Sequence, residues 1–204
     1  MRDSKWKRMV ILTGFAALMG VASPVQAQVL VQAIGGMAKT AETKPVFAGA
    51  ISGKAGPVEL GVEVGHFDTI APKSIFDATL AASGGKVDAD LPAWYGMGSL
   101  KLIAKSGAVQ PFVQVGAGAA RLHPMLDGSA PNVTVSSQFG ESGDTTKFLA
   151  AAGAGLRIKV QKVLVEGGYR FVRVFTNFEP NSNFKDDKVL VNAHVVYVAL
   201  GFHF

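Results

Sequence analysis

Alternation of apolar residues at every second position is the feature of this 204-residue chain that most limits its fold. In residues 148–160, FLAAAGAGLRIKV, every second residue from Phe148 onward is apolar, whereas the interleaved positions include Arg157 and Lys159. Successive side chains of a β-strand point to opposite faces of a sheet. The pattern therefore predicts a strand with one wholly apolar face.

The same alternation recurs along the chain and predicts eight strands. They cover residues 29–38, 45–52, 58–69, 91–105, 109–122, 146–160, 163–176 and 189–204. No window after residue 27 approaches the run of about 18 apolar residues that a membrane-spanning helix needs. The fold class is therefore expected to be all-β.

The connections between these segments alternate in length. Tight turns are expected at residues 52–56, 105–108 and 161–162. Longer segments rich in Gly, Ser, Asp, Asn and Pro cover about 70–90, 123–145 and 177–188, and the connection at 40–44 is the short exception. Short turns at one end and long loops at the other are typical of outer-membrane barrels. We therefore predict an eight-stranded antiparallel up-and-down transmembrane β-barrel, with its short turns in the periplasm.

Residues 1–27 predict a cleaved signal peptide that precedes a barrel over residues 28–204. Basic residues precede an apolar run from Met9 to Ala22, and Val25 and Ala27 stand where small residues are expected before a cut after Ala27. The alternative is an amphipathic anchor or a transmembrane helix. The run is short for a span, and Pro24 follows it closely.

The charge of the exported part argues against a nucleic-acid partner. Residues 1–27 carry four Lys/Arg and one acid, so the net charge falls from +5 to 5 − 3 = +2 over the remaining 204 − 27 = 177 residues. Basicity that belongs mostly to an export signal gives nucleic-acid binding little support. The absence of cysteine excludes disulfides, thiolate metal sites and a lipid-modified N-terminal cysteine.

Charged residues of the strands are expected to point into the barrel, because lipid cannot solvate them. The inward candidates are Glu59, Glu63, Lys101, Arg157, Lys159, Glu166 and Arg170. Their signs nearly balance, and an eight-stranded barrel holds only its own side chains or one small ligand. We therefore predict a buried ion-pair network that plugs the lumen. A narrow ion-conducting path or a proton-transfer site is the alternative.

The outward positions include three residues with interfacial roles. Arg173 is an exception to the apolar outward set, and we expect it to reach lipid phosphates near the loop end. Trp94 and Tyr169 are expected in an aromatic belt at the membrane interface.

The sequence contains no pattern typical of a catalytic or metal-binding site. His66, His123, His194 and His203 are scattered, and neither HExxH nor GxSxG occurs. Acids of the long segments could hold a divalent cation, although solvated loop charge is the commoner interpretation; they are Asp88, Asp90, Glu179, Asp186 and Asp187. No cofactor, metal or enzymatic activity is predicted.

Three stretches, VVYVALGFHF at the end, PFVQVGAGAARL and VELGVEVGHF, carry a resemblance to a known family. With the signal segment and the eight alternating segments, they resemble the small OmpA/OmpX-type, porin-like outer-membrane β-barrels of Gram-negative bacteria. The resemblance implies an outer-membrane location and contact with outer-membrane lipid and lipopolysaccharide. It also implies an assembly signal for the barrel-assembly machinery, formed by Phe204, Phe202, Leu200 and Val198.

The function expected from these features is an integral outer-membrane barrel with a plugged lumen. Its long extracellular loops would give it a structural role or a surface-interaction role toward an extracellular ligand or host surface. A narrow porin-like channel or small-solute transporter is the alternative. An outer-membrane lipid-modifying enzyme is a further one, although the His-x-Ser motif of such enzymes does not occur. A soluble ligand-binding barrel would require the reverse pattern, apolar inside and polar outside.

Overall fold

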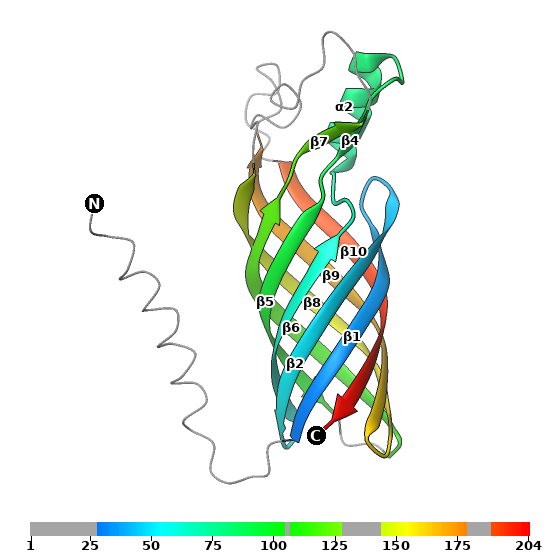
Figure 1. Ribbon diagram of the computed structural model, residues 1–204, viewed down its shortest axis with the longest axis vertical. Helices are drawn as coiled ribbons and strands as arrows, with labels where there is room; N and C mark the ends of the chain where they lie inside the picture. The colour runs from blue at the N-terminus through cyan, green and yellow to red at the C-terminus, as the bar shows by residue number, and fades with distance from the viewer. Residues whose placement is uncertain (1–27, 105–106, 128–143, 179–188) are drawn as a thin grey trace, which may run out of the picture.

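A closed barrel of eight antiparallel strands forms the body of the molecule in a computed structural model, which describes residues 28–104, 107–127, 144–178 and 189–204 (Figure 1). The barrel strands are β1 (Gln28–Lys39), β2 (Thr43–Ala55), β3 (Val58–Phe67), β5 (Ala93–Ile103), β6 (Val109–Leu122), β8 (Thr145–Val160), β9 (Val163–Phe178) and β10 (Val189–His203). Around the barrel their order is β1-β10-β9-β8-β6-β5-β3-β2. The predicted fold class is confirmed. The predicted signal peptide lies outside the described residues.

Pairing of the first strand with the last closes the barrel. β1 and β10 pair from Leu30 opposite His203 to Lys39 opposite His194. Closure leaves no unpaired strand edge, which is the condition for a sheet to cross lipid without exposed backbone polar groups.

The turns at one end of the barrel are short, as predicted. Gly56 takes a left-handed backbone conformation with φ 63° in the β2–β3 turn, and Gln161 does so with φ 55° in the β8–β9 turn. In Figure 1 the C-terminus and the start of β1 lie at this end. We call it the short-turn end and the opposite one the loop end.

The loop end carries regular structure that the alternation did not predict. Helix α2 (Lys73–Ser83) and strand β4 (Asp88–Asp90) lie between β3 and β5, and β4 pairs with β7 (Met125–Asp127). Figure 1 shows α2 and this small sheet standing beyond the barrel. The helix ends at Gly84, whose φ of 63° gives a left-handed C-cap. No helix in the part of the chain that the structure describes is long and apolar enough to cross a membrane.

The two faces of the strands differ sharply in exposure. On β3, Leu60 and Val64 are 50% and 55% exposed on the outer surface, whereas Glu59 and Glu63 are buried inside. We call the exposed outward side chains the apolar belt; they include Val31, Phe47, Ile51, Leu60, Val64, Leu100, Leu102, Val113, Val115, Phe148, Leu156, Ile158, Val165, Val196, Val198 and Leu200. An apolar surface this extensive requires lipid around it.

Candidate functional site: a charged lumen and a cleft at the loop end

Four charged side chains from four strands meet in the lumen near the short-turn end, and we call them the lower cluster: Glu59, Lys101, Arg157 and Glu166. The Arg157 guanidinium donates to both carboxylate oxygens of Glu59, at 2.7 and 3.1 Å. It also donates to Glu166, with Nε 2.9 Å from Oε2. Lys101 Nζ donates to the two oxygens of Glu166 at 2.7 and 2.9 Å and lies 3.7 Å from Glu59.

A second group, the upper cluster, consists of Glu63, Tyr95 and Arg170 and lies nearer the loop end. Arg170 Nη1 donates to the two oxygens of Glu63 at 2.8 and 2.9 Å. The Tyr95 hydroxyl donates to Glu63 at 2.5 Å and accepts a hydrogen bond from Arg170 Nη2 at 3.2 Å. The carboxylate therefore has partners on two other strands.

These contacts cross the lumen. Three strands separate β3 from β9 along either path around the barrel, so the Glu63–Arg170 pair joins opposite walls. The two clusters contain three carboxylates and three cations, all with at most 7% residue exposure. Burial removes the carboxylates and the cations from water, which costs desolvation free energy. Only close pairing with opposite charges and hydrogen bonds offsets that cost.

Little open space remains between the side chains. A cavity of about 20 Å³ lies in the lumen beside both clusters, and Ser99 and Gln114 contribute to its lining. That volume is enough for about one water molecule.

The structure brings six of the seven predicted inward charges into these clusters and leaves Lys159 out. Lys159 follows Arg157 on the inward set of β8, but it is exposed at the short-turn end, where its Nζ contacts Gln28 Oε1 at 3.4 Å. Its placement in the network is wrong because alternation fixes the face of the strand and not the height along it. Two residues beyond Arg157, the chain has already reached the mouth of the barrel.

Four polar residues contribute to the lumen without having been assigned to the network. Gln32 Nε2 donates to Glu166 at 3.1 Å, and Gln114 Nε2 donates to the Tyr197 hydroxyl at 3.2 Å. The fourth is Tyr95 of the upper cluster. The inward positions of Tyr95 and Tyr197 were visible in the alternation, but their partners depend on register between strands.

The outward polar residues of β9 and β10 form contacts at the loop-end side of the apolar belt. Arg173 Nε donates to Asn192 Oδ1 at 2.9 Å, and its guanidinium lies 5.7 Å from the centre of the Phe171 ring. The Tyr169 hydroxyl and His194 Nδ1 are hydrogen-bonded at 2.5 Å. The side chain of Arg173 thus faces outward, where contact with a lipid headgroup is sterically open.

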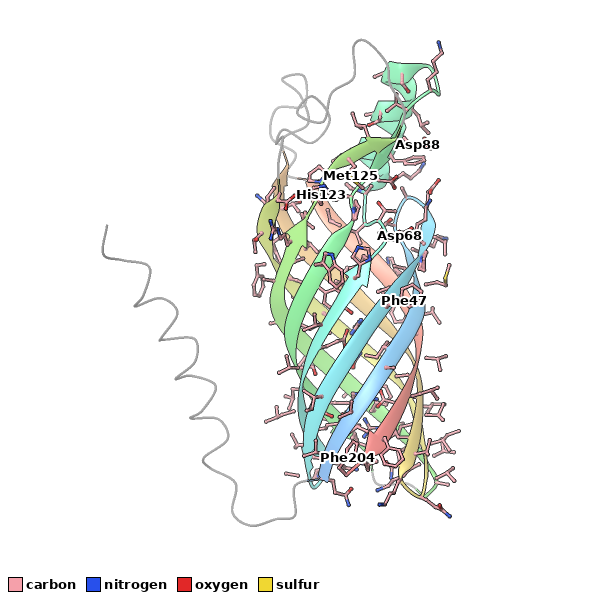
Figure 2. All side chains as sticks on the ribbon, in the orientation of Figure 1. Phe47, Asp68, Asp88, His123, Met125 and Phe204 are labelled. Atoms are coloured by element: carbon pink, nitrogen blue, oxygen red, sulfur yellow. The ribbon has the colours of Figure 1, made fainter. Side chains whose placement is uncertain are left out.

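A cleft of about 660 Å³, which we call the rim cleft, lies at the loop end on the outer side of β3, β5 and β6. Its walls are His66, Asp68, Pro92, Trp94, Arg121, His123, Met125 and Asp144. Figure 2 labels three of these residues, Asp68, His123 and Met125, near the loop end of the barrel.

Asp144 organises the polar side of the rim cleft. It accepts a hydrogen bond from Arg121 Nε at 3.0 Å, forms an ion pair with Arg121 Nη2 at 2.7 Å, and is hydrogen-bonded to His123 Nδ1. The hydrogen bond with His123, together with the hydrogen bond from Arg121, lowers the pKa of Asp144. The carboxylate is therefore ionised over the physiological pH range.

The four histidines lie at separate places. His66 and His194 are on the outer surface, His123 is in the rim cleft, and His203 is buried inside the short-turn end. Within the described ranges, no group of three or more His, Asp or Glu side chains is arranged to hold a metal ion. Of the acids considered for cation binding, Glu179, Asp186 and Asp187 lie outside the described residues.

The end of the chain is tied to the barrel. The Phe204 amide donates to the Val29 carbonyl at 2.9 Å, and the rings of Phe202 and Phe204 lie 5.3 Å apart. Phe204 is 76% exposed, so its side chain projects from the outer surface at the short-turn end.

Comparison with known proteins shows the fold. No family model matches the chain, and no curated protein matches it. Among solved structures it is similar to Neisserial surface protein A, with a TM-score of 0.54 and 12% identity over 87% of this chain and 97% of that one. A major outer membrane protein from Thermus thermophilus gives 0.54 and 11%, over 88% of this chain and 100% of that one. Outer membrane protein H from P. aeruginosa gives 0.51 and 13%, over 87% and 99%.

The chain therefore has the fold of the small eight-stranded outer-membrane barrels, as its sequence predicted. The shared fold and the apolar belt together support the predicted outer-membrane location.

Proposed function

We propose that this protein is a sealed outer-membrane barrel that anchors a structured surface outside the membrane. The observation that carries the proposal is the pairing of three carboxylates with three cations across the lumen. A continuous water path would have to pass these paired side chains, and the cavity beside them holds about one water molecule.

The loop end supports a structural or surface-interaction role. Helix α2 and the β4–β7 sheet pack together beyond the barrel, and their hydrogen bonds fix the backbone where the chain leaves the membrane. For example, Ser83 Oγ accepts hydrogen bonds from the amides of Lys86 and Val87 at 3.2 and 3.1 Å. A fixed outer surface of this kind suits contact with an extracellular ligand or a host surface.

Contact with lipid is the second part of the proposal. Arg173 lies above apolar outward residues of β9 and β10, where a cation reaches the phosphate groups of outer-leaflet lipid or lipopolysaccharide. Phe204 at the short-turn end is proposed as part of the signal that the barrel-assembly machinery reads.

Planar-bilayer recording tests the sealed lumen. Protein purified from outer membranes is expected to give no stable ohmic openings. Stable openings whose conductance changes in Lys101→Ala or Glu63→Ala would contradict the proposal and favour a narrow channel. Lys39→Ala is the matched control, because Lys39 is exposed on the outer surface at the loop end of β1.

Electrophoresis tests the membrane assignment separately. A folded transmembrane barrel is expected to migrate differently on an SDS gel before and after boiling, and to fractionate with the outer membrane. Recovery of the protein in the soluble periplasmic fraction, without that shift, would refute the assignment.

A further inference from the structure

We propose that the rim cleft binds a neutral sugar ring. This inference concerns the outer surface of β3, β5 and β6 and goes beyond the sealed lumen and the anchoring role. Three properties of the cleft carry it: an exposed tryptophan wall, a fixed set of polar groups beside that wall, where Arg121 is the cross-strand neighbour of Trp94, and a charge balance that does not favour anions.

The tryptophan wall consists of Trp94, supported from one side by His66. The Trp94 side chain is 63% exposed, and its ring centre lies 4.8 Å from that of His66. An indole ring offers a flat apolar face together with one N–H donor. The C–H face of a pyranose ring is complementary to such a surface, and Pro92 and Met125 extend the apolar contact.

The polar groups of the cleft can serve hydroxyls that both donate and accept. Arg121 uses Nε and Nη2 for Asp144, and His123 uses Nδ1, so Arg121 Nη1 and His123 Nε2 have no partner within the described residues. The Asp68 carboxylate accepts no side-chain hydrogen bond among them and supplies acceptors. Donors and acceptors at fixed positions on one wall are what a sugar's hydroxyl groups require.

Charge distinguishes a neutral sugar from a phosphorylated or acidic ligand. One cation, Arg121, stands against two carboxylates, Asp68 and Asp144, so with neutral histidines the cleft carries 1 − 2 = −1. Asp144 already engages two of the three guanidinium nitrogens of Arg121, Nε and Nη2. A phosphate would meet one guanidinium already neutralised by Asp144, with only its Nη1 free, and two like charges, which disfavours it.

The size and position of the cleft suit this ligand. A volume of about 660 Å³ lies within the range of roughly 300–1,000 Å³ of small-molecule sites. The cleft opens outward at the loop end, above the apolar belt. Sugars attached to membrane lipid and sugars free in the medium can both reach it.

Tryptophan fluorescence gives a direct test, because the cleft contains the reporter. The chain has two tryptophans, and Trp6 lies in the predicted signal, so Trp94 alone reports in the exported protein. Purified protein in a detergent without a sugar headgroup is titrated with maltose, with dodecyl maltoside and with glucose 6-phosphate; dodecyl phosphocholine controls for micelle effects. We expect a saturable change in Trp94 emission with a maltose-bearing probe and a weaker response to glucose 6-phosphate.

Variants assign the response to the cleft. Arg121→Ala and Asp144→Ala are each expected to weaken binding about tenfold or more, because each removes hydrogen-bonding groups from the polar wall. Lys39→Ala is the control, since it removes an exposed cation from the loop end of β1 that does not line the cleft. The heat-dependent gel shift checks that each variant is folded. If an alanine variant does not fold, Arg121→Gln is measured in its place.

Each outcome decides the proposal. Binding of both maltose and dodecyl maltoside supports it, and binding of dodecyl maltoside alone supports it with a lipid-linked sugar as the ligand. The proposal is overturned if neither neutral probe gives a saturable response, if glucose 6-phosphate binds more tightly than maltose, or if both cleft variants bind as the wild type does. None of these results depends on whether the lumen conducts.

Discussion

Replacing Arg157 by alanine should be among the most destabilising single changes in this barrel. Arg157 is 1% exposed and forms the centre of the lower cluster, with hydrogen bonds to Glu59 and Glu166. Its removal leaves two buried carboxylates with Lys101 as the one cation of the cluster, so the net charge there falls from 0 to −1. Removing one partner of a buried ion pair costs about 3–5 kcal/mol, because an uncompensated charge stays buried.

Urea unfolding in detergent micelles, followed by Trp94 fluorescence, measures this loss. With a slope of about 2 kcal/mol/M, a loss of about 4 kcal/mol lowers the unfolding midpoint by about 2 M. Lys159→Ala is the matched control on the same strand and face. Lys159 is exposed at the barrel mouth, so its replacement should change the free energy of unfolding by no more than about 0.5 kcal/mol.

A second variant separates the charge from the packing. If the penalty arises from an orphaned carboxylate, Glu59→Gln in the Arg157→Ala background should recover at least about 1 kcal/mol of stability. Equal stabilities of Arg157→Ala and Lys159→Ala would refute the reasoning. So would a Glu59→Gln change that lowers the stability of the Arg157→Ala protein still further.

Three further predictions concern other parts of the molecule. Gly118→Ala should lower the free energy of unfolding by about 1–3 kcal/mol, because a Cβ there would lie 2.0 Å from the Gly96 carbonyl oxygen. Gly96→Ala is the control, since a Cβ at this outward position meets nothing within 4 Å. The same urea assay compares the two variants, and equal unfolding midpoints would contradict the steric account. Deleting Phe204 should lower the amount of protein inserted into the outer membrane, measured by fractionation with the heat-dependent gel shift; unchanged insertion counts against its role as an assembly signal. Hydrogen bonds with His123 and Arg121 lower the pKa of Asp144, so its NMR titration should have a midpoint below the usual value of about 3.9. The ion pair with Arg121 should be lost as the pH falls through the lowered pKa, and Arg121→Ala should raise the midpoint. An unshifted midpoint in the wild type would show that the pairing is absent in solution.

The barrel could be predicted because lipid and strand geometry act on each residue locally. The alternation assigns a side chain such as Leu60 to one of the two faces of its strand. The face that carries charged residues must point into the lumen, so the other face contacts lipid. The even number of strands and the short turns then fix the closure. No long-range information was needed for these steps.

Helix α2 escaped prediction because few of its fully buried residues are apolar. The residues that it buries are Ile75, Thr79 and Ser83, spaced by four, and two of the three carry hydroxyls. Those hydroxyls donate to the backbone, Thr79 to the Ile75 carbonyl at 2.8 Å and Ser83 to the Leu80 carbonyl at 3.2 Å. Ile75, Phe76 and Leu80 are the large apolar residues of the helix, and so short a stripe gives hydrophobic periodicity little signal over 11 residues.

The same limit explains which functional groups the sequence could not assemble. Whether a side chain points inward or outward depends on one strand alone. Contact across the lumen or at the rim depends on the relative heights of several strands. Arg157 and Lys159 point to the same face of β8, but Arg157 is buried and Lys159 is exposed. Arg121 and Asp144 are 23 residues apart, and they meet because β6 pairs with β8. If the lumen is sealed, as we propose, chemistry that engages other molecules is left to the outer surface. The rim cleft is the part of that surface where polar groups and an exposed tryptophan converge.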